Sequence, residues 1–532
     1  MDDALASPPA PTDRARRLTV EALATRVLPI AVCLYAVIRA IRAFGEYNHN
    51  DHMYVAAASL FPHLALYRDI AYVQTPLSIF LYAALNALFG PSWLYLSARL
   101  TSVLFVLGAA LLAAKTAERL AQRTYVFWIS FALILFNHGT FSNMAQTGNY
   151  ALPLLLFAFA CFRYFGRTVE KFDALLIGLC LGLASSSKVS FIAPMSAFAL
   201  IFVVDRQSRM FALQYVLGCV LGLLPILYYL IADWPDFLFL NFEFHLLTND
   251  FRGLTIHTSI IQVVRGFAYF LKGVTPVWLI LAMAAPILAT WTSHQSLRNR
   301  VAAAAAVIFA STVASAIMPM TYQLPYWGPA ALAFTMFAVP AAAVVADRSP
   351  VFRTAAMLIA LGLAGLSSAA DIWLLTRDGA DKYPPVLVMR AQAAIARSVG
   401  AALRDHPGCV TEILSASAIP ALGSGVPLSP GSAGGEFLFR IDGLLRHRHP
   451  EFRKYSDVTR YMGPTTGLLV GYYGERGFDG QMLGYALTHD FGRAGTFNYP
   501  KSPLSLYLPP ECQTPAPSPL AFDPAFPILR GF

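Results

Sequence analysis

Long apolar runs with almost no charged residues constrain this chain more than any other feature. One of them, "VAAAAAVIFASTVASAIM" (301–318), contains no charged side chain. A bilayer core of about 30 Å is crossed by a helix of about 20 apolar residues, and backbone polar groups inside it need internal partners. Only 13% of all residues are charged, well below a typical soluble domain. The sequence therefore predicts a polytopic α-helical membrane protein.

Eleven transmembrane helices are predicted from the apolar runs. They cover residues 27–43, 96–114, 125–137, 149–162, 173–185, 189–204, 211–231, 271–291, 301–318, 327–346 and 354–374. The segment "PLSIFLYAALNALFG" (76–90) is also apolar, but it is short and begins with Pro76. It is predicted to be a juxtamembrane or re-entrant helix rather than a span.

Basic residues set the predicted orientation. With 76–90 not counted as a span, the loops on the N-terminal side hold sixteen Lys and Arg and the other side holds eight. By the positive-inside rule, residues 1–26 form a cytoplasmic tail of a bacterial inner-membrane protein. The net charge of +9 is attributed to loops that face anionic membrane lipids, and no nucleic-acid partner is expected. The eight outer cations are Arg39, Arg42, Arg68, Arg99, Lys188, Arg252, Arg265 and Lys272.

Residues 375–532 differ from the rest of the chain and are predicted to form a small exterior (periplasmic) α/β domain. Strands are expected at 409–415, 466–473 and 504–508, helices at 388–406 and 478–491, and a Pro-rich end at 509–527. Cys409 and Cys512 both fall here, where a disulfide can form, and two free cysteines are the alternative.

Titratable side chains gather where the chain first leaves the predicted membrane. His49, Asp51 and His52 lie within four positions, directly before an apolar run. Asp51 is either a helix N-cap or a functional carboxylate. Histidines on the outer loops allow a divalent metal with Glu46 or Glu243, or ordinary hydrogen-bonded imidazoles. These histidines are His49, His52, His63, His138, His245 and His257.

The stretch 50–105 resembles the first extracytoplasmic loop of the GT-C glycosyltransferases, within them the protein O-mannosyltransferase and lipid A aminoarabinose transferase group. The architecture is similar over residues 27–374, with a first outer loop at 44–95, and "QLPYWGPAALAF" (323–334) is similar to a late loop of these enzymes. The matching positions of the first loop are Asp51, Tyr54, Ala57, Tyr67, Arg68, Asp69, Pro76, Leu77, Phe89, Gly90 and Arg99.

The resemblance implies transfer of a sugar from a polyprenyl-phosphate donor to an envelope acceptor, which is a lipid, a glycan or a protein. It assigns Asp51 as general base and assigns Tyr54, Arg68, Asp69 and Asn149 to the substrate loop. Two positions depart from the family pattern. His52 replaces the second acid of the loop, and Asn149 stands where many relatives have an acid after the third span. His52 is expected to orient the acceptor or to bond Asp51.

The chemistry of an inverting transfer predicts one carboxylate and several cations at the outer face. A single displacement needs one general base, and the departing phosphate needs a cation near it. Asp51 supplies the base, and Arg99 and Lys188 could equally be snorkelling side chains. The candidates for binding the donor phosphate are Arg99, Lys188, Arg252, Arg265 and Lys272.

Two other classes of protein remain open at this point. A transporter or flippase of lipid-linked sugars is also polytopic, although such proteins commonly show internal repeats, and none is evident here. An O-antigen ligase or polymerase uses the same class of donor. Those enzymes usually carry their large functional loop late in the chain, whereas the long loop here directly follows the first span.

Overall fold

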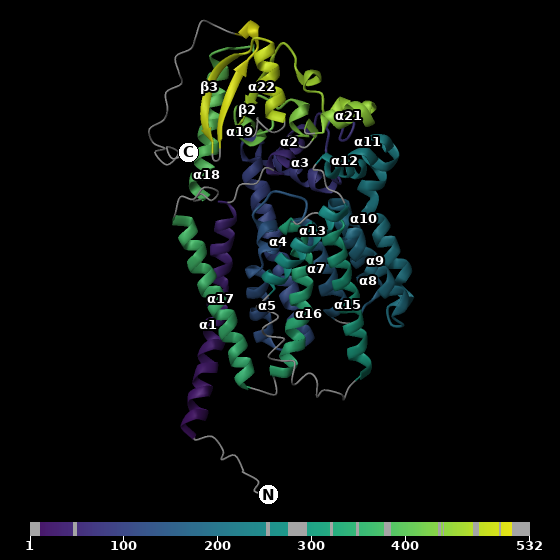
Figure 1. The fold of residues 1–532 in the computed structure, drawn as a ribbon. Coiled ribbons are helices and arrows are strands. Elements are labelled where there is room, and N and C mark those ends of the chain that lie inside the picture. The colour runs from purple at the N-terminus through teal and green to yellow at the C-terminus, as the bar shows by residue number, and fades with distance from the viewer. Residues whose placement is uncertain are drawn as a thin grey trace.

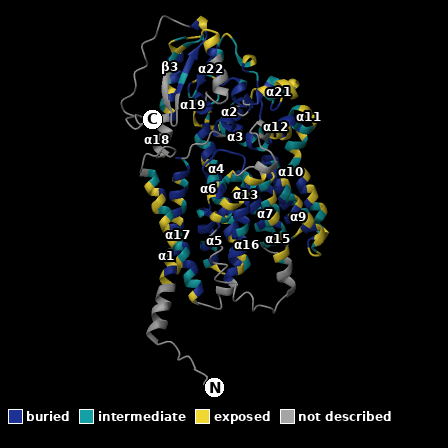
Figure 2. Cartoon of the chain, viewed as in Figure 1, coloured by how far each residue is buried: buried dark blue, intermediate teal, exposed yellow. Residues whose placement is uncertain are grey.

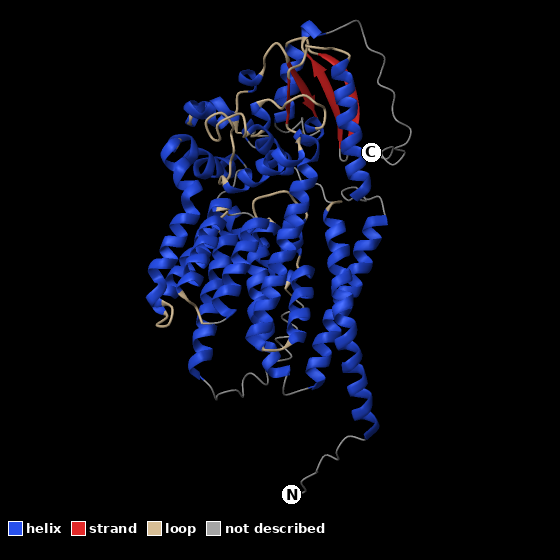
Figure 3. Ribbon diagram, turned by 180° about the vertical axis from the view of Figure 1, so that it is seen from behind, coloured by secondary structure: helices blue, strands red, loops and turns tan. Residues whose placement is uncertain are grey.

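The computed structural model describes residues 11–45, 50–166, 168–251, 256–274, 295–319, 323–346, 350–376, 385–434, 438–439, 441–471, 478–499 and 502–512. Its helices form a bundle (Figure 1), and a four-stranded sheet lies at one end of that bundle, called the sheet end below. The view from behind shows the same division between a helical body and a single sheet (Figure 3).

Ten of the eleven predicted spans coincide with helices of the bundle, and most of the remaining one, 271–291, lies outside the described residues. Five of the described helices are long and apolar enough to cross a membrane alone, and a bent pair makes a sixth candidate. The chain is thus a polytopic helical membrane protein. The bundle contains α1 (Pro11–Ala43), α4 (Pro91–Ala121), α5 (Thr124–Phe136), α7 (Ala151–Gly166), α8 (Lys171–Ser187), α9 (Ile192–Val204), α10 (Ala212–Ala232), α15 (Gln295–Ile317), α16 (Gly328–Ala346) and α17 (Pro350–Thr376).

Large apolar side chains cover the outward faces of the bundle. Leu213 and Ile231 on α10 are 75% and 83% exposed, and Leu366 on α17 is 75% exposed. Figure 2 shows exposed residues along the outer sides of both helices. A water-soluble protein rarely exposes apolar side chains along whole helices, and lipid is the surrounding that suits them.

Glycines allow α8 and α10 to pack closely. A Cβ atom on Gly182 would lie 2.5 Å from the Cys219 carbonyl oxygen, and one on Gly222 would lie 2.5 Å from the Leu179 carbonyl oxygen. No side chain fits at either position, so the two backbones meet directly. This is the small-residue packing expected between helices in a membrane.

A buried ion-pair group joins the first and last helices of the bundle. Arg39 and Arg42 of α1 both donate to Asp371 of α17, at 2.9 and 2.8 Å. The Arg39 guanidinium also lies 3.8 Å from the centre of the Phe141 ring. All three charged side chains are nearly inaccessible, so removing Asp371 would leave two buried cations without their shared carboxylate.

The connection between α1 and α4 forms two helices, α2 (Asn50–Leu60) and α3 (Leu77–Phe89), which lie between the bundle and the sheet (Figure 1). α3 covers the segment 76–90 and has 13 residues, too few to cross a bilayer. Gly90 follows it with a positive φ of 80°, which L side chains rarely adopt, and Pro91 then begins α4.

The chain bends sharply after α5. α6 (His138–Met144) is turned by 73° from α5, and Asn137 caps it by accepting hydrogen bonds from the Gly139 and Thr140 amides. The segment that follows, Gln146–Tyr150, is buried at every residue. It connects α6 to α7.

The sheet has the strand order β1-β2-β4-β3, with β1 parallel to β2 and the other pairs antiparallel. Three strands overlap the predicted ones, whereas β3 was not predicted because its glycines favour turns. Their bounds are β1 (Glu412–Ser415), β2 (Thr466–Val470), β3 (Gly492–Tyr499) and β4 (Ser502–Leu508). The helices nearby are α18 (Pro385–Arg404), α19 (Ala418–Leu422), α21 (Asp442–Arg448) and α22 (Phe478–Thr488).

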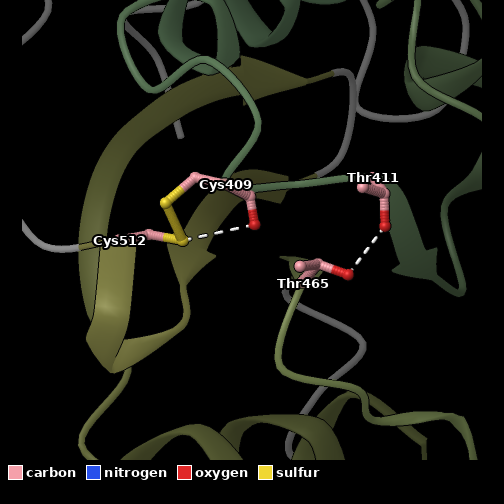
Figure 4. The surroundings of a disulfide bond; sticks show 4 residues. All are labelled: Cys409, Thr411, Thr465 and Cys512. Atoms are coloured by element: carbon pink, nitrogen blue, oxygen red, sulfur yellow. Dashed lines mark hydrogen bonds between the residues drawn. A yellow bond between two sulfur atoms is a disulfide. The ribbon is translucent and has the colours of Figure 1, made fainter.

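Cys409 and Cys512 form a disulfide with a Cα–Cα distance of 5.5 Å (Figure 4). It joins the chain just before β1 to the chain just after β4. Close by, the hydroxyl groups of Thr411 and Thr465 lie 2.7 Å apart. The structure thus contains the disulfide alternative for this pair. The predicted Pro-rich end lies mostly outside the described residues.

The sheet and the connection between α1 and α4 share one hydrophobic core. It includes Met53 and Val55 from α2 together with Leu469 and Leu506 from the sheet. Residues of the helices that follow α10 also contact this core; these helices are α11 (Trp234–Leu238), η3 (Phe239–Glu243) and α12 (Phe244–Phe251). So do residues of η6 (Pro450–Tyr455), which precedes β2. Phe239 stacks on Phe452 with ring centres 4.0 Å apart. The sheet is therefore packed onto the helical body and not loosely tethered to it.

Candidate active site

Asp51 occupies the first turn of α2 and is completely buried. Its carboxylate forms an ion pair with Arg99 of α4 and accepts a hydrogen bond from the Thr147 amide at 2.5 Å. It is therefore held by groups from α4 and from the segment after α6. Neither contact is the local amide contact of an N-cap.

Arg99, predicted as a candidate partner of the donor phosphate, lies beside Asp51. Its side chain is fully buried and donates to Asp51, to the Tyr95 hydroxyl at 2.9 Å and to the Ala43 carbonyl at 3.3 Å. The position of Arg99 on α4 places its guanidinium beside the carboxylate of Asp51. Its charge offsets that of Asp51.

Lys188, between α8 and η1 (Val189–Phe191), is the second buried charge of this region and is 6% exposed. Its ammonium donates to the Gln74 side-chain oxygen at 2.8 Å and lies 5.1 and 5.4 Å from the ring centres of Tyr150 and Tyr326. Burial lowers the pKa of Lys188 from 10.5 to about 7. Since no carboxylate is among these contacts, an anion such as a phosphate would be the natural partner of this ammonium.

The segment 147–149 connects Asp51 to Lys188. At one end, the Thr147 amide binds Asp51, and at the other, the Asn149 side chain donates at 2.8 Å to the same Gln74 oxygen that binds Lys188. Between them, the Gly148 carbonyl accepts a hydrogen bond from the hydroxyl of Tyr82 at 2.8 Å. A movement of the Gln74 side chain would therefore alter the position of the segment 147–149 and its hydrogen bond to Asp51.

His52 faces the sheet and not the carboxylate of Asp51. Its Nδ1 accepts a hydrogen bond from the Ile419 amide of α19 at 3.1 Å. Burial lowers the pKa of His52 from 6.5 to about 3, so the ring is neutral and its proton sits on Nε2. His52 thus ties the helix that carries Asp51 to the sheet.

Tyrosines surround the same region. Tyr54 follows Asp51 on α2, and its ring meets that of Tyr72 edge-on at 6.0 Å. Burial raises the pKa of Tyr54 and of Tyr72 well above 10 and raises that of Tyr82 to about 12. All three are neutral hydrogen-bonding groups at physiological pH.

Arg68 and Asp69 lie on the surface, away from the buried groups. Their side chains are 66% and 40% exposed, and their charged atoms lie 3.6 Å apart. Asp69 also accepts a hydrogen bond from the Ala65 amide, so it stabilises the turn after α2. The described contacts of Arg68 and Asp69 are thus with each other and with the loop backbone.

The remaining predicted cations are less closely tied to the site. Arg265 and Lys272 are exposed on α13 (Ile256–Gly273), whose Gly266 lies against Trp327 of η4 (Leu324–Trp327). Arg252, His49 and Glu46 lie outside the described residues. Among the described residues, no three His, Cys, Asp or Glu side chains gather as a metal site would require. His245 instead contacts the Val73 carbonyl at 3.2 Å.

The residues of the site that were not predicted include Gln74, Thr147 and Ile419. Gln74 is a polar residue before Pro76 and a helix, a signal that sequence reasoning could have used. Thr147 and Ile419 act through their backbone amides, which no residue type reveals.

The arrangement of the helices and the loop over them matches the fold of ArnT, which is a GT-C fold. Among solved structures, the chain is similar to ArnT, a lipid A aminoarabinose transferase, from Cupriavidus metallidurans, in its crystal structure bound to undecaprenyl phosphate. The two are 14% identical with a TM-score of 0.52, over 92% of this chain and 98% of the other. The apo crystal structure of the same ArnT gives 13% identity and a TM-score of 0.49. No family model matches the sequence, and no curated protein matches it.

Proposed function

We propose that this protein transfers a sugar from a polyprenyl-phosphate donor to an acceptor of the cell envelope, with inversion at the anomeric carbon. The observation that carries the proposal is a buried carboxylate, Asp51, linked through the segment 147–149 to a buried ammonium, Lys188, that has no carboxylate among its contacts. The GT-C fold supports it, and the ArnT structure of that fold contains undecaprenyl phosphate.

In the proposed reaction the acceptor oxygen forms a bond to the anomeric carbon while the bond from that carbon to the phosphate oxygen breaks. The hydroxyl proton passes to Asp51 as general base. The electron pair of the broken bond stays on the polyprenyl phosphate, whose negative charge Lys188 would stabilise. One displacement inverts the configuration, and it requires no carboxylate nucleophile.

Asp51 has to become accessible for this reaction, because its carboxylate is enclosed by Arg99 and Thr147. A donor phosphate would compete with Gln74 for the Lys188 ammonium. Since Asn149 donates to the same Gln74 oxygen, the competition loosens the segment 147–149 and its amide contact to Asp51. Donor binding would thus prepare the base for the acceptor.

The proposed location of the reaction is the outer face of a bacterial inner membrane, with a cytoplasmic N-terminus and the sheet in the periplasm. The excess of basic residues in the loops at the opposite end supports this orientation. A reporter fused after Arg119 should then be cytoplasmic, and one fused after β2 should be exterior. The reverse pattern would refute the orientation.

The direct test is reconstitution of the full chain in lipid with an undecaprenyl-phosphate-linked sugar and an extract of envelope lipids and glycans. We expect sugar-labelled acceptor and free undecaprenyl phosphate as products, and loss of both with Lys188→Ala. Lys115→Ala, at an exposed lysine near the other end of α4, is the matched control and should keep full activity. Movement of intact donor across the membrane without release of undecaprenyl phosphate would show a transporter instead.

A further inference from the structure

The groups around Asp51 and Lys188 are almost all uncharged. The described part of the site has two cations, Arg99 and Lys188, and one carboxylate, which Arg99 already offsets. Gln74 and Asn149 connect them through neutral amides. The site therefore has a net positive charge before any donor binds, and a donor phosphate at Lys188 would bring it close to neutral.

Apart from Asp51, no described acid is among the contacts of Arg99, Lys188, Gln74 or Asn149 given above. Several acids near the sheet end pair with cations elsewhere: Asp69 with Arg68, Asp236 with Lys454, and Asp371 with Arg39 and Arg42.

Buried hydroxyl groups in the same two chain segments have no hydrogen-bond partner among the described residues. They belong to Tyr72, Thr75 and Thr147, whose side chains are at most 2% exposed. Tyr72 and Thr75 flank Gln74, and Thr147 precedes the Asn149 that binds Gln74. Leaving a buried hydroxyl unpaired is costly, and such groups commonly face a ligand or an ordered water. A sugar ring offers several hydroxyls that would pair with them.

We propose that the donor sugar is neutral, and that the site excludes sugars with a cationic amino group. The inference rests on the proposed transfer function and specifies its substrate class. Hydroxyl groups of a neutral hexose or pentose would pair with Tyr72, Thr75 and Thr147. An ammonium group would find no free carboxylate among the described residues of the site, so nothing would offset the cost of burying its charge. Asn149, which binds Gln74, is an amide and offers no negative charge.

The experiment is native mass spectrometry of the full chain with two donors at equal concentration. One carries glucose or mannose and the other carries 4-amino-arabinose, each on undecaprenyl phosphate. We expect the neutral donor to occupy the protein at least about tenfold more than the amino donor, which corresponds to roughly 1.4 kcal/mol. Equal occupancy, or an excess of the amino donor, would overturn the inference. Failure of both donors and of undecaprenyl phosphate to bind would instead overturn the proposed function.

A charge substitution tests the physical cause. Asn149→Asp should shift the occupancy ratio toward the amino donor by about tenfold, because it adds a carboxylate within the site. The matched control is Gln122→Glu, which adds the same charge at the exposed residue that follows α4. This residue is 23 positions beyond Arg99, about 35 Å away by helix length. It should leave the ratio unchanged. An equal shift in both variants would refute recognition by the site.

Hydroxyl removal separates contacts to the sugar from contacts to the phosphate. Tyr72→Phe and Thr75→Val should weaken binding of the neutral donor by several-fold to about tenfold, the effect of one lost hydrogen bond. Both should bind undecaprenyl phosphate, which lacks the sugar, as the parent does. Equal weakening of both lipids would mean that these hydroxyls do not contact the sugar.

Discussion

The buried pair of Asp51 and Arg99 makes a demanding prediction for the variant Asp51→Asn. Both side chains are fully buried, and the substitution leaves the Arg99 charge without its counter-charge. Removing one partner of a buried ion pair costs about 3–5 kcal/mol. Asp51→Asn should therefore be clearly less stable than the parent, as well as inactive. Loss of a cap alone would cost only about 1 kcal/mol, and Asn is itself a good cap.

The double variant Asp51→Asn with Arg99→Gln separates stability from catalysis. It removes both charges, so its destabilisation should be smaller than the sum of the two single variants by at least about 2 kcal/mol. Its rate should stay low, by about 10²–10⁴ relative to the parent, because no general base is restored.

Thermal unfolding in detergent with a fluorescent thiol or tryptophan readout gives the stability, and release of undecaprenyl phosphate from the donor gives the rate. Arg99→Gln alone is measured beside them, since it leaves Asp51 buried without its cation. The reasoning is refuted if the double variant regains stability together with near-parent activity. Asp51 would then be a structural partner of Arg99, and the base would have to be another residue.

Three further predictions concern the phosphate partner, the disulfide and the helix packing. The pKa of Lys188 is lowered to about 7, so its side chain is charged below pH 7. The kcat/KM for the donor should therefore fall as the pH rises through 7. In Lys188→Arg, which stays charged, this fall should disappear. Cys409→Ser removes a disulfide that spans 103 residues and should lower the free energy of unfolding by about 2–5 kcal/mol. The sheet should then be cleaved faster by a protease, and the parent protein treated with a reductant should behave in the same way. Gly182→Val should disrupt the packing of α8 on α10 and lower the Tm, whereas Gly362→Val, with nothing within 4 Å of its Cβ position, should not.

Local composition predicted the helices well because a membrane-spanning helix is a property of one continuous segment. Ten of the predicted spans match helices of the bundle, and the segment 76–90 contains the short helix α3. Strand β3 was missed, since Gly492 and Gly495 lower its β propensity and only pairing with β4 fixes it.

The sequence identified charged residues of the candidate site, but it did not identify the partners that these residues contact. Asp51 and Lys188 are charged residues at unusual positions, so the sequence reveals them. Their partners depend on the tertiary fold, since Arg99 is 48 residues from Asp51 and Ile419 is 367 residues from His52. Residue type suggested a phosphate partner for Arg99, and only the packing of α4 against α2 reveals its ion pair with Asp51.

The core shared by α2 and the sheet also sets an order of events during synthesis. The apolar side of α2 is covered by residues of the sheet region, whose first helix begins about 325 residues after α2 ends. At about 5–20 residues per second, the ribosome needs roughly 15–65 s to deliver that cover. Throughout this interval α2 has α3 and α4 beside it but lacks the cover that the sheet region provides. The apolar side of α2 that faces the sheet would need lipid or a chaperone as cover until the sheet region is made.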